Sequence, residues 1–252
     1  MNKEYSCKVL KREMLTEDTA YLTIECRDIA VKARPGQFVN VSCSKFLKRP
    51  FGIASVDTVK GTFNIGIKMV GEGTSKLVSI AEGSIVDVLG PLGNGFDLSI
   101  SDSYILVSGG TGVFPINFAY ETLKSEGKEV TVVQGFRDSS QMCLTREDYI
   151  VTTDAGDHGI KGTCIAGLDT VSIEDGAVVC CVGPAPMMKA VGNWASDKGL
   201  KCYVSMEQRM ACGIGICLVC VCKVKAEEQG IPFNHVRCCK DGPVFEFGEV
   251  IL

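Results

Sequence analysis

The 252-residue sequence predicts a multidomain chain: an N-terminal antiparallel β-barrel, an α/β domain with a parallel sheet, and a small cysteine-rich C-terminal domain. Short β-forming runs separated by Gly and Pro occupy residues 5–97, a pattern typical of a closed or nearly closed barrel. From residue 104 on, apolar strands alternate with helical segments, as in parallel sheets with crossover helices. Several cysteines gather after residue 206. The predicted bounds are 1–100, 101–205 and 206–252.

Composition excludes several classes of protein. The net charge of −4 and the pI near 5.4 offer no electrostatic attraction to nucleic acid or to an anionic membrane. The N-terminal residues lack the apolar stretch of a signal peptide, and no apolar run approaches the ~20 residues that span a bilayer. Fourteen cysteines in a chain of this kind indicate metal ligands and reduced thiols rather than disulfides. We therefore expect a cytoplasmic protein with neither nucleic-acid nor membrane partners.

The strands of the predicted barrel come first. Residues 21–26, 38–43 and 63–67 alternate in character and are rich in β-forming side chains. Turn signals separate them, at 34–36, 60–61, 82–83 and 90–95.

Two segments of this barrel could hold an anionic cofactor. In Arg49-Pro50-Phe51-Gly52, the rigid proline could direct the guanidinium at a pyrophosphate while the adjacent backbone meets a flat ring. In residues 70–74, glycines bring backbone N–H groups close to a phosphate, and Thr74 can cap the next helix. Each segment alone also fits an ordinary strand start or a glycine-rich turn.

The α/β domain begins with an apolar strand at 104–107. This strand runs into Gly109-Gly110-Thr111-Gly112, and glycines that end a strand and open a helix mark where parallel sheets bind phosphate groups. The spacing is not the Rossmann G-x-G-x-x-G. Asp154 either orients a ribose or nicotinamide, or caps a turn. We predict further strands and two helices, with the strands at 129–134, 149–153, 177–182 and 202–206 and the helices at 116–126 and 186–198.

The cysteine-rich segment carries the most specific pattern in the chain. Cys212, Cys217 and Cys220 read C-x4-C-x2-C, which is the plant-type [2Fe-2S] ligand spacing. A cysteine-rich surface loop and a zinc site are the alternatives, but a zinc ribbon usually has two C-x2-C knuckles. The fourth ligand is Cys238 or Cys239. Adjacent side chains of an extended segment point to opposite faces, so only one of the two can bind, and spacing alone does not choose.

Residues 207–220, with 239–245, resemble the electron-transfer subunit of type B dihydroorotate dehydrogenase. The resemblance implies FAD and a [2Fe-2S] cluster as cofactors and NAD(H) as substrate. It implies a role in pyrimidine biosynthesis beside an FMN-containing catalytic subunit, in a heterotetramer of two plus two. It also selects Cys239 as the fourth ligand, because residues 240–245 are similar to the segment directly after the family's last ligand.

The resemblance extends over nearly the whole chain and implies the remaining site residues. For FAD these are Arg49, Pro50, Phe51, Gly52, Gly66, Ile67, Lys68, Gly73 and Thr74. For the nicotinamide cofactor they are Gly109, Gly110, Thr111, Gly112, Gly183 and Pro184. The sequence departs from the family at three of these positions, where a hydroxyl residue, an aromatic residue and an arginine are replaced by Gly52, Ile67 and Lys68.

No residue is identifiable as the acid or base that would oxidise dihydroorotate, so we expect the substrate site to lie on the partner chain. Two other hypotheses remain open. The chain could serve another dehydrogenase or a bifurcating ferredoxin–NADP reductase as its small flavin and iron–sulfur subunit. It could also be a cluster-based redox sensor without turnover, which would not oxidise a nicotinamide.

Overall fold

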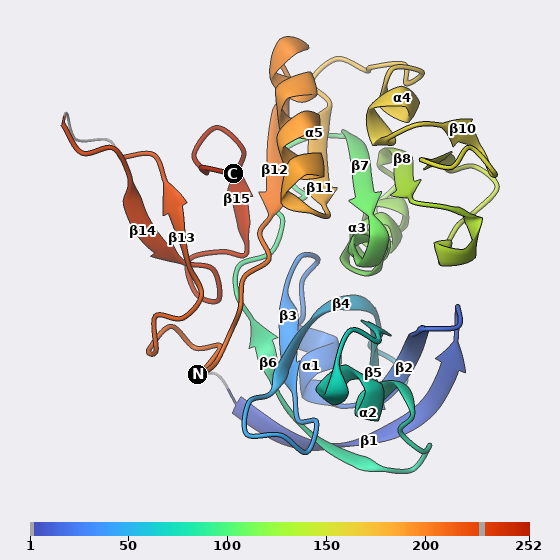
Figure 1. The fold of residues 1–252 in the computed structure, drawn as a ribbon, viewed down its shortest axis with the longest axis vertical. Coiled ribbons are helices and arrows are strands. Elements are labelled where there is room, and N and C mark those ends of the chain that lie inside the picture. Colours follow the sequence, from blue (N-terminus) through green and yellow to red (C-terminus); the bar gives the residue numbers. More distant parts are fainter. Residues whose placement is uncertain (1–2, 227–229) are drawn as a thin grey trace.

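The computed structural model describes residues 3–226 and 230–252 (Figure 1). The β-barrel lies at one end of the molecule, the large sheet with its helices lies at the other, and a β-hairpin projects to one side. The fold class predicted from the sequence is confirmed. Among the described residues, no helix is long and apolar enough to cross a membrane.

The barrel closes in the strand order β1-β2-β5-β4-β3-β6, with antiparallel neighbours throughout. Alternate residues of β6 are buried, which is the pattern of a strand with one face on a core. The core of the barrel is apolar and includes Leu22, Ile24, Phe63 and Ile65. The barrel comprises β1 (Lys3–Met14), β2 (Thr19–Glu25), α1 (Arg27–Lys32), β3 (Phe38–Val41), β4 (Arg49–Asp57), β5 (Thr62–Lys68), α2 (Glu72–Val78) and β6 (Ile85–Leu92).

The second unit is a seven-stranded sheet with the order β10-β9-β8-β7-β11-β12-β15, parallel except for its last strand. Its central strands β7 and β11 are almost entirely buried, as expected for a parallel sheet with both faces covered. The elements up to β12 are β7 (Ser103–Gly109), η1 (Gly110–Gly112), α3 (Val113–Ser125), β8 (Glu129–Phe136), η2 (Ser139–Gln141), β9 (Ile150–Thr153), β10 (Ile160–Lys161), α4 (Cys164–Leu168), β11 (Val178–Val182), α5 (Ala185–Asp197) and β12 (Lys201–Ser205).

The C-terminal segment forms a hairpin and then returns to the large sheet. β13 (Val221–Val224) pairs with β14 (Asn234–Arg237), and β15 (Val244–Glu246) runs antiparallel to β12. One buried apolar cluster contains residues of all three units, among them Phe38 and Leu92 of the barrel, Val204 of β12, and Cys238. The three units therefore share a core.

Helix α3 fixes the large sheet to the barrel. A methyl group added at Gly66 of β5 would overlap the ring of Phe114, which also stacks on Tyr21 with ring centroids 6.0 Å apart. The buried side chain of Asn117 donates from Nδ2 to the carbonyl oxygen of Ala54 in β4, at 3.0 Å. Close packing and a buried hydrogen bond thus join α3 to two barrel strands.

The Asn117 bond yields a prediction about stability. Replacing Asn117 by Leu leaves the buried Ala54 carbonyl without its donor, so the free energy of unfolding should fall by about 1–3 kcal/mol. Chemical denaturation measures this change. Thr122→Val is the control, because the hydroxyl of Thr122 donates within α3, to the carbonyl of Phe118 at 2.9 Å. It should change stability by about 0.5 kcal/mol or less. Equal losses of unfolding free energy in the two variants would show that the Asn117 hydrogen bond does not stabilise the contact between α3 and the barrel.

Candidate functional site

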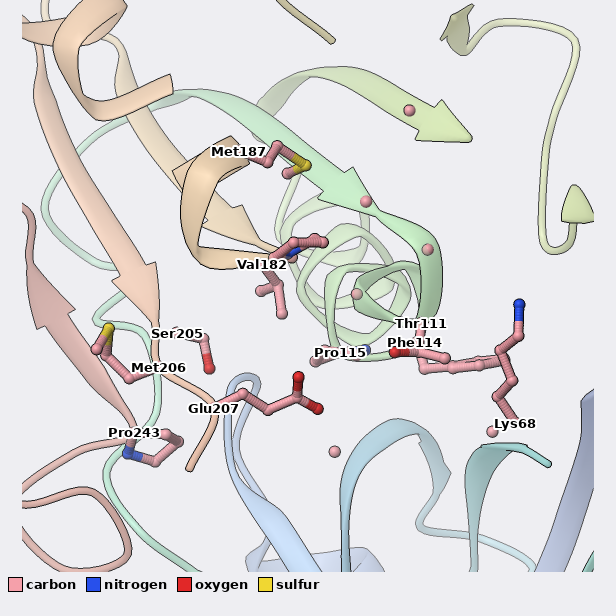
Figure 2. A pocket seen from close by; sticks show the side chains of 18 of the residues that line it. Lys68, Thr111, Phe114, Pro115, Val182, Met187, Ser205, Met206, Glu207 and Pro243 are labelled. Carbon is pink, nitrogen blue, oxygen red and sulfur yellow. The ribbon is translucent and has the colours of Figure 1, made fainter. Parts of the chain in front are cut away.

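A cavity of about 950 Å³ lies where the barrel, the large sheet and the start of the C-terminal segment meet. Figure 2 shows Lys68 on one side of it and Glu207 with Pro243 on the other, with Thr111 and Pro115 between them. The cavity lies outside the carboxyl ends of β7, β8, β9 and β11, where open α/β sheets bind their ligands.

The barrel wall of the cavity contains most of the predicted FAD residues. The residues on this wall are Arg49, Pro50, Phe51, Gly52, Gly66, Lys68 and Thr74. Ile67 is placed differently: β5 alternates, so its side chain is fully buried in the barrel core while both neighbours face the cavity. Lys68 forms an ion pair with Asp18, with 3.5 Å between Nζ and Oδ2, and donates to Gln141 Oε1 at 3.2 Å.

Arg49 is held in place next to a loop that is closed by its own threonine. Arg49 Nη1 donates to the carbonyl of Leu47 at 2.8 Å, which fixes the guanidinium at the cavity edge. A methyl group added at Gly73 would lie 3.1 Å from Arg49 Nε, so a side chain here would require the arginine to shift. Thr74 Oγ1 accepts the N–H groups of Val70 and Gly71 at 2.9 and 3.0 Å. A cation beside a tight glycine loop suits a pyrophosphate.

The predicted nicotinamide residues converge on the opposite wall. The cavity is lined there by Gly109, Gly110, Thr111, Gly112, Gly183 and Pro184. A methyl group added at Gly112 would overlap the carbonyl of Val182, and one at Gly109 would overlap the sulfur of Met187. These glycines therefore let the β7–α3 loop lie directly against the end of β11.

Further residues line the cavity beyond the predicted site residues, among them Asp154, for which the sequence left a binding role and a turn cap open. Arg137 follows β8 and Asp154 follows β9, so both stand at the carboxyl edge of the sheet. Their positions at strand ends were the only available signal, and it led to Asp154 alone. Glu207 and Met210 extend the wall towards the cysteine-rich loop. Figure 2 shows the carboxylate of Glu207 directed into the cavity.

The four predicted ligand cysteines form two pairs. The N–H of Cys217 donates to Cys212 Sγ at 3.4 Å, and the N–H of Cys239 donates to Cys220 Sγ at 3.5 Å. Within residues 3–226 and 230–252, no three His, Cys, Asp or Glu side chains converge on a position for one ion. Two pairs of thiols fit a [2Fe-2S] cluster, in which each of the two irons takes two protein thiolates.

The environments of these thiols differ. Burial disfavours ionisation of Cys212, but the N–H groups of Cys217 and Ile214 outweigh it and lower the pKa of this thiol to about 6. Burial, together with the bond to Cys220, raises the pKa of Cys239 to about 12. Cysteine ligands bind metal as thiolates, so metal binding at Cys239 releases a proton.

The neighbouring cysteines point elsewhere. Cys238 is fully buried and its Sγ donates to the carbonyl of Met206 at 3.2 Å. Cys222 Sγ lies 3.8 Å from the carbonyl of Val236, within the β13–β14 hairpin. This arrangement favours Cys239 over Cys238, and also over Cys222, as the fourth ligand.

Comparison with known proteins agrees with this geometry. The iron-sulfur cluster binding domain of dihydroorotate dehydrogenase B matches residues 207–251, and the oxidoreductase FAD-binding domain matches residues 6–96. The electron transfer subunit of dihydroorotate dehydrogenase B (NAD(+)) from Bacillus caldolyticus is 35% identical over 256 residues, covering 97% of each chain. The corresponding subunit from Caldanaerobacter subterraneus subsp. tengcongensis is 33% identical over 257 residues, covering 100% of each chain.

This chain belongs to the dihydroorotate dehydrogenase B electron transfer subunit family.

Solved structures widen the comparison. The NADH-dependent reduced ferredoxin-NADP oxidoreductase, studied for flavin-based electron bifurcation, has a chain with a TM-score of 0.86 at 29% identity, covering 98% of this chain and 90% of that one. Phthalate dioxygenase reductase has a TM-score of 0.64 at 17% identity, covering 93% and 76%. The second likeness shows the fold alone.

The family matches confirm the predicted FAD-binding and iron–sulfur domains. The packing around position 52 explains why this sequence departs from the family there. A methyl group added at Gly52 would lie 3.3 Å from three atoms of the Pro115 ring, so a side chain here would require that ring to move. Gly52 thus accompanies the close approach of α3 to the barrel. The structure offers no explanation for the lysine at position 68.

The paired thiols yield a prediction about the fourth ligand. Cys239→Ser should abolish or strongly alter the visible iron–sulfur absorbance and the EPR signal of the reduced protein, because one iron loses a thiolate. Cys238→Ser is the matched control and should leave both spectra nearly intact, since its sulfur faces Met206. The assignment is wrong if the cluster is lost in Cys238→Ser and retained in Cys239→Ser.

A second prediction concerns the cation beside the glycine loop. Arg49→Ala should weaken FAD binding by a few kcal/mol, at about 1.5–3 per charge-assisted bond, with a smaller effect on the fold. Flavin retained after dilution and gel filtration is the measurement, with thermal unfolding as the check on folding. Lys60→Ala is the control, because this exposed lysine forms an ion pair with Asp57 and does not line the cavity. Stoichiometric FAD in Arg49→Ala would exclude this residue as the anchor.

Proposed function

We propose that this chain transfers electrons between a catalytic dihydroorotate dehydrogenase subunit and NAD. One observation carries the proposal: a single cavity wall runs from Arg49 through Gly109-Gly110-Thr111-Gly112 to Met210, two residues before Cys212. A site for a flavin, a site for a nicotinamide and the cluster loop, residues 212–220, therefore adjoin one another.

The chain's own residues bind and orient. Arg49 and the loop closed by Thr74 hold a pyrophosphate, while the backbone around Pro50 and Gly52 lies beside the flat ring. The glycines after β7 and Gly183 with Pro184 leave room for the nicotinamide cofactor to approach that ring. The four cysteines hold the cluster. FAD, when bound, supplies the exchange between two-electron hydride chemistry and one-electron cluster chemistry.

The partner and the assembly belong to the same proposal. The partner is an FMN-containing catalytic subunit, and the complex is a cytoplasmic heterotetramer of two plus two. In support, the cluster loop carries exposed apolar side chains at Ile216, Leu218 and Val219, which are 75%, 59% and 51% exposed. Adjacent exposed apolar side chains indicate a protein–protein contact. We assign residues 1–100 to FAD, 101–205 to NAD and 206–252 to the cluster.

One alternative has a specific observation in its favour. The 29% identity and the TM-score of 0.86 to the NADH-dependent reduced ferredoxin-NADP oxidoreductase chain fit a small subunit of a bifurcating complex. The family match of residues 207–251 and the higher identity to the dihydroorotate dehydrogenase subunits support the first proposal instead. The nature of the electron donor separates the two.

We predict that the isolated chain, loaded with FAD and its cluster, oxidises NADH with an artificial acceptor and is not reduced by dihydroorotate. Dihydroorotate should reduce it only after the catalytic subunit is added, because the chain has no assigned acid or base for that substrate. Absorbance changes of flavin and cluster under anaerobic conditions measure both reactions. The Cys239→Ser variant is the control, since it should keep NADH oxidation and lose reduction through the partner.

Two outcomes would contradict the proposal. Reduction of the isolated chain by dihydroorotate would place the substrate site here. A natural partner that supplies electrons from ferredoxin or NADPH, and not from dihydroorotate, would favour the bifurcating complex.

A further inference from the structure

Asn40 is a buried polar residue of the barrel that lies against the cluster loop. The neighbouring residues Val39 and Val41 point into the barrel core, so the alternation of β3 turns Asn40 outwards. A methyl group added at Gly213 would overlap Asn40 Nδ2, so the amide nitrogen touches the loop next to Cys212. Asn40 is nevertheless only 1% exposed, because the loop covers it.

The same residue borders the strand that carries the flavin anchor. In the β3–β4 ladder Asn40 stands directly opposite Pro50, which lines the cavity beside Arg49. Asn40 thus lies between two parts of the site. It pairs with Pro50 of the barrel wall, which we call the flavin wall, and it directly contacts the cluster loop.

The hydrogen bonding of Asn40 is incomplete in the described chain. Its Oδ1 is buried and has no partner among residues 3–226 and 230–252. Buried amides are almost always hydrogen-bonded, because an unpaired buried polar group is costly. The unpartnered Oδ1 is an acceptor and does not itself identify a ligand. The group of this amide that faces the loop at Gly213 is the donor Nδ2. A buried amide where an apolar side chain would cost less indicates a polar group near that loop.

We propose that Asn40 is a positioning residue for the iron–sulfur cluster, with its side-chain N–H directed at a cluster sulfur or at the thiolate of Cys212. The inference rests on the proposed function, since it requires the cluster. Sulfur atoms carry more negative charge in the reduced cluster, and hydrogen bonds to them are among the factors that set its potential. The Asn40 amide therefore favours the reduced cluster and fixes the loop against the flavin wall.

Glycine at position 213 is part of the same arrangement. Its φ of +71° suits glycine, and the absence of a side chain leaves the space that the Asn40 amide occupies. Cys212 Sγ already accepts the N–H groups of Ile214 and Cys217 at 3.5 and 3.4 Å. The Asn40 amide meets the loop from the barrel at Gly213, the residue next to Cys212.

Redox titration of the loaded protein tests the proposal. Asn40→Leu keeps the branched shape of the side chain and removes the donor, so the midpoint potential of the cluster should fall by about 59 mV or more, which corresponds to a roughly tenfold change in a one-electron equilibrium. Asn40→Asp keeps the shape and adds a negative charge, so its potential should fall further. The g-values of the reduced EPR signal should change in both variants.

Asn64→Leu is the matched control. Asn64 is also a barrel asparagine with a buried, unpartnered Oδ1, but its Nδ2 donates to Ser55 Oγ at 2.7 Å, within the β4–β5 region. The cluster potential and the EPR signal of the Asn64→Leu variant should match those of the unaltered protein, even if the variant is less stable. A general effect of burying leucine in the barrel would appear in this variant as well.

The outcomes separate this inference from the proposed function. Unchanged potentials and EPR signals in Asn40→Leu and Asn40→Asp, with the cluster present, would overturn the role of Asn40. If Asn40→Leu fails to fold or to hold a cluster, Asn40→Asp decides alone. An unaltered chain that binds no [2Fe-2S] cluster at all would contradict the proposed function instead.

Discussion

The contact between the start of α3 and the barrel is the constraint on which the site depends. Phe114 occupies the space left by Gly66, Pro115 lies against Gly52, and Asn117 bonds to Ala54. α3 follows directly from the glycines that end β7. Docking the helix on the barrel therefore sets the carboxyl edge of the sheet opposite the flavin wall. Glycines on the barrel side make this approach close.

The C-terminal segment is fixed to both units by hydrogen bonds to its backbone carbonyls. The N–H of Met206 donates to the carbonyl of Pro243 at 2.8 Å, and β15 extends the sheet beside β12. From the barrel, Asn94 Nδ2 donates to the carbonyls of Lys240 and Asp241 at 3.2 and 3.0 Å. The residues that follow Cys239 are thus held by the barrel and the sheet together.

The side chain of Arg237 joins the two segments that supply the cysteines. Arg237 Nε and Nη2 each donate to the carboxylate of Asp241 at 2.9 Å, and Nη1 donates to the carbonyl of Gly215 at 3.3 Å. The guanidinium therefore spans from the Cys239 segment to the cluster loop. The loop is thus contacted by Arg237 at Gly215 and by Asn40 at Gly213.

Local patterns in the sequence predicted the fold class, the glycine loops and the cysteine spacing, because each depends on neighbouring residues. Features that depend on strand register could not be predicted from these local patterns. Ile67 was assigned to the flavin site with its neighbours, yet the alternation of β5 turns it into the barrel core. The return of β15 to the sheet and the place of Asn40 beside Gly213 also depend on pairing between distant segments.

The central claim is that one chain brings nicotinamide, flavin and cluster together so that electrons pass among them without a second molecule. Anaerobic mixing with NADH, followed by freezing at set times and EPR of the reduced cluster, tests this most directly. The account predicts that the cluster signal appears with a rate constant independent of protein concentration once NADH is saturating. A signal that never forms, or one whose rate constant rises in proportion to protein concentration, would contradict it.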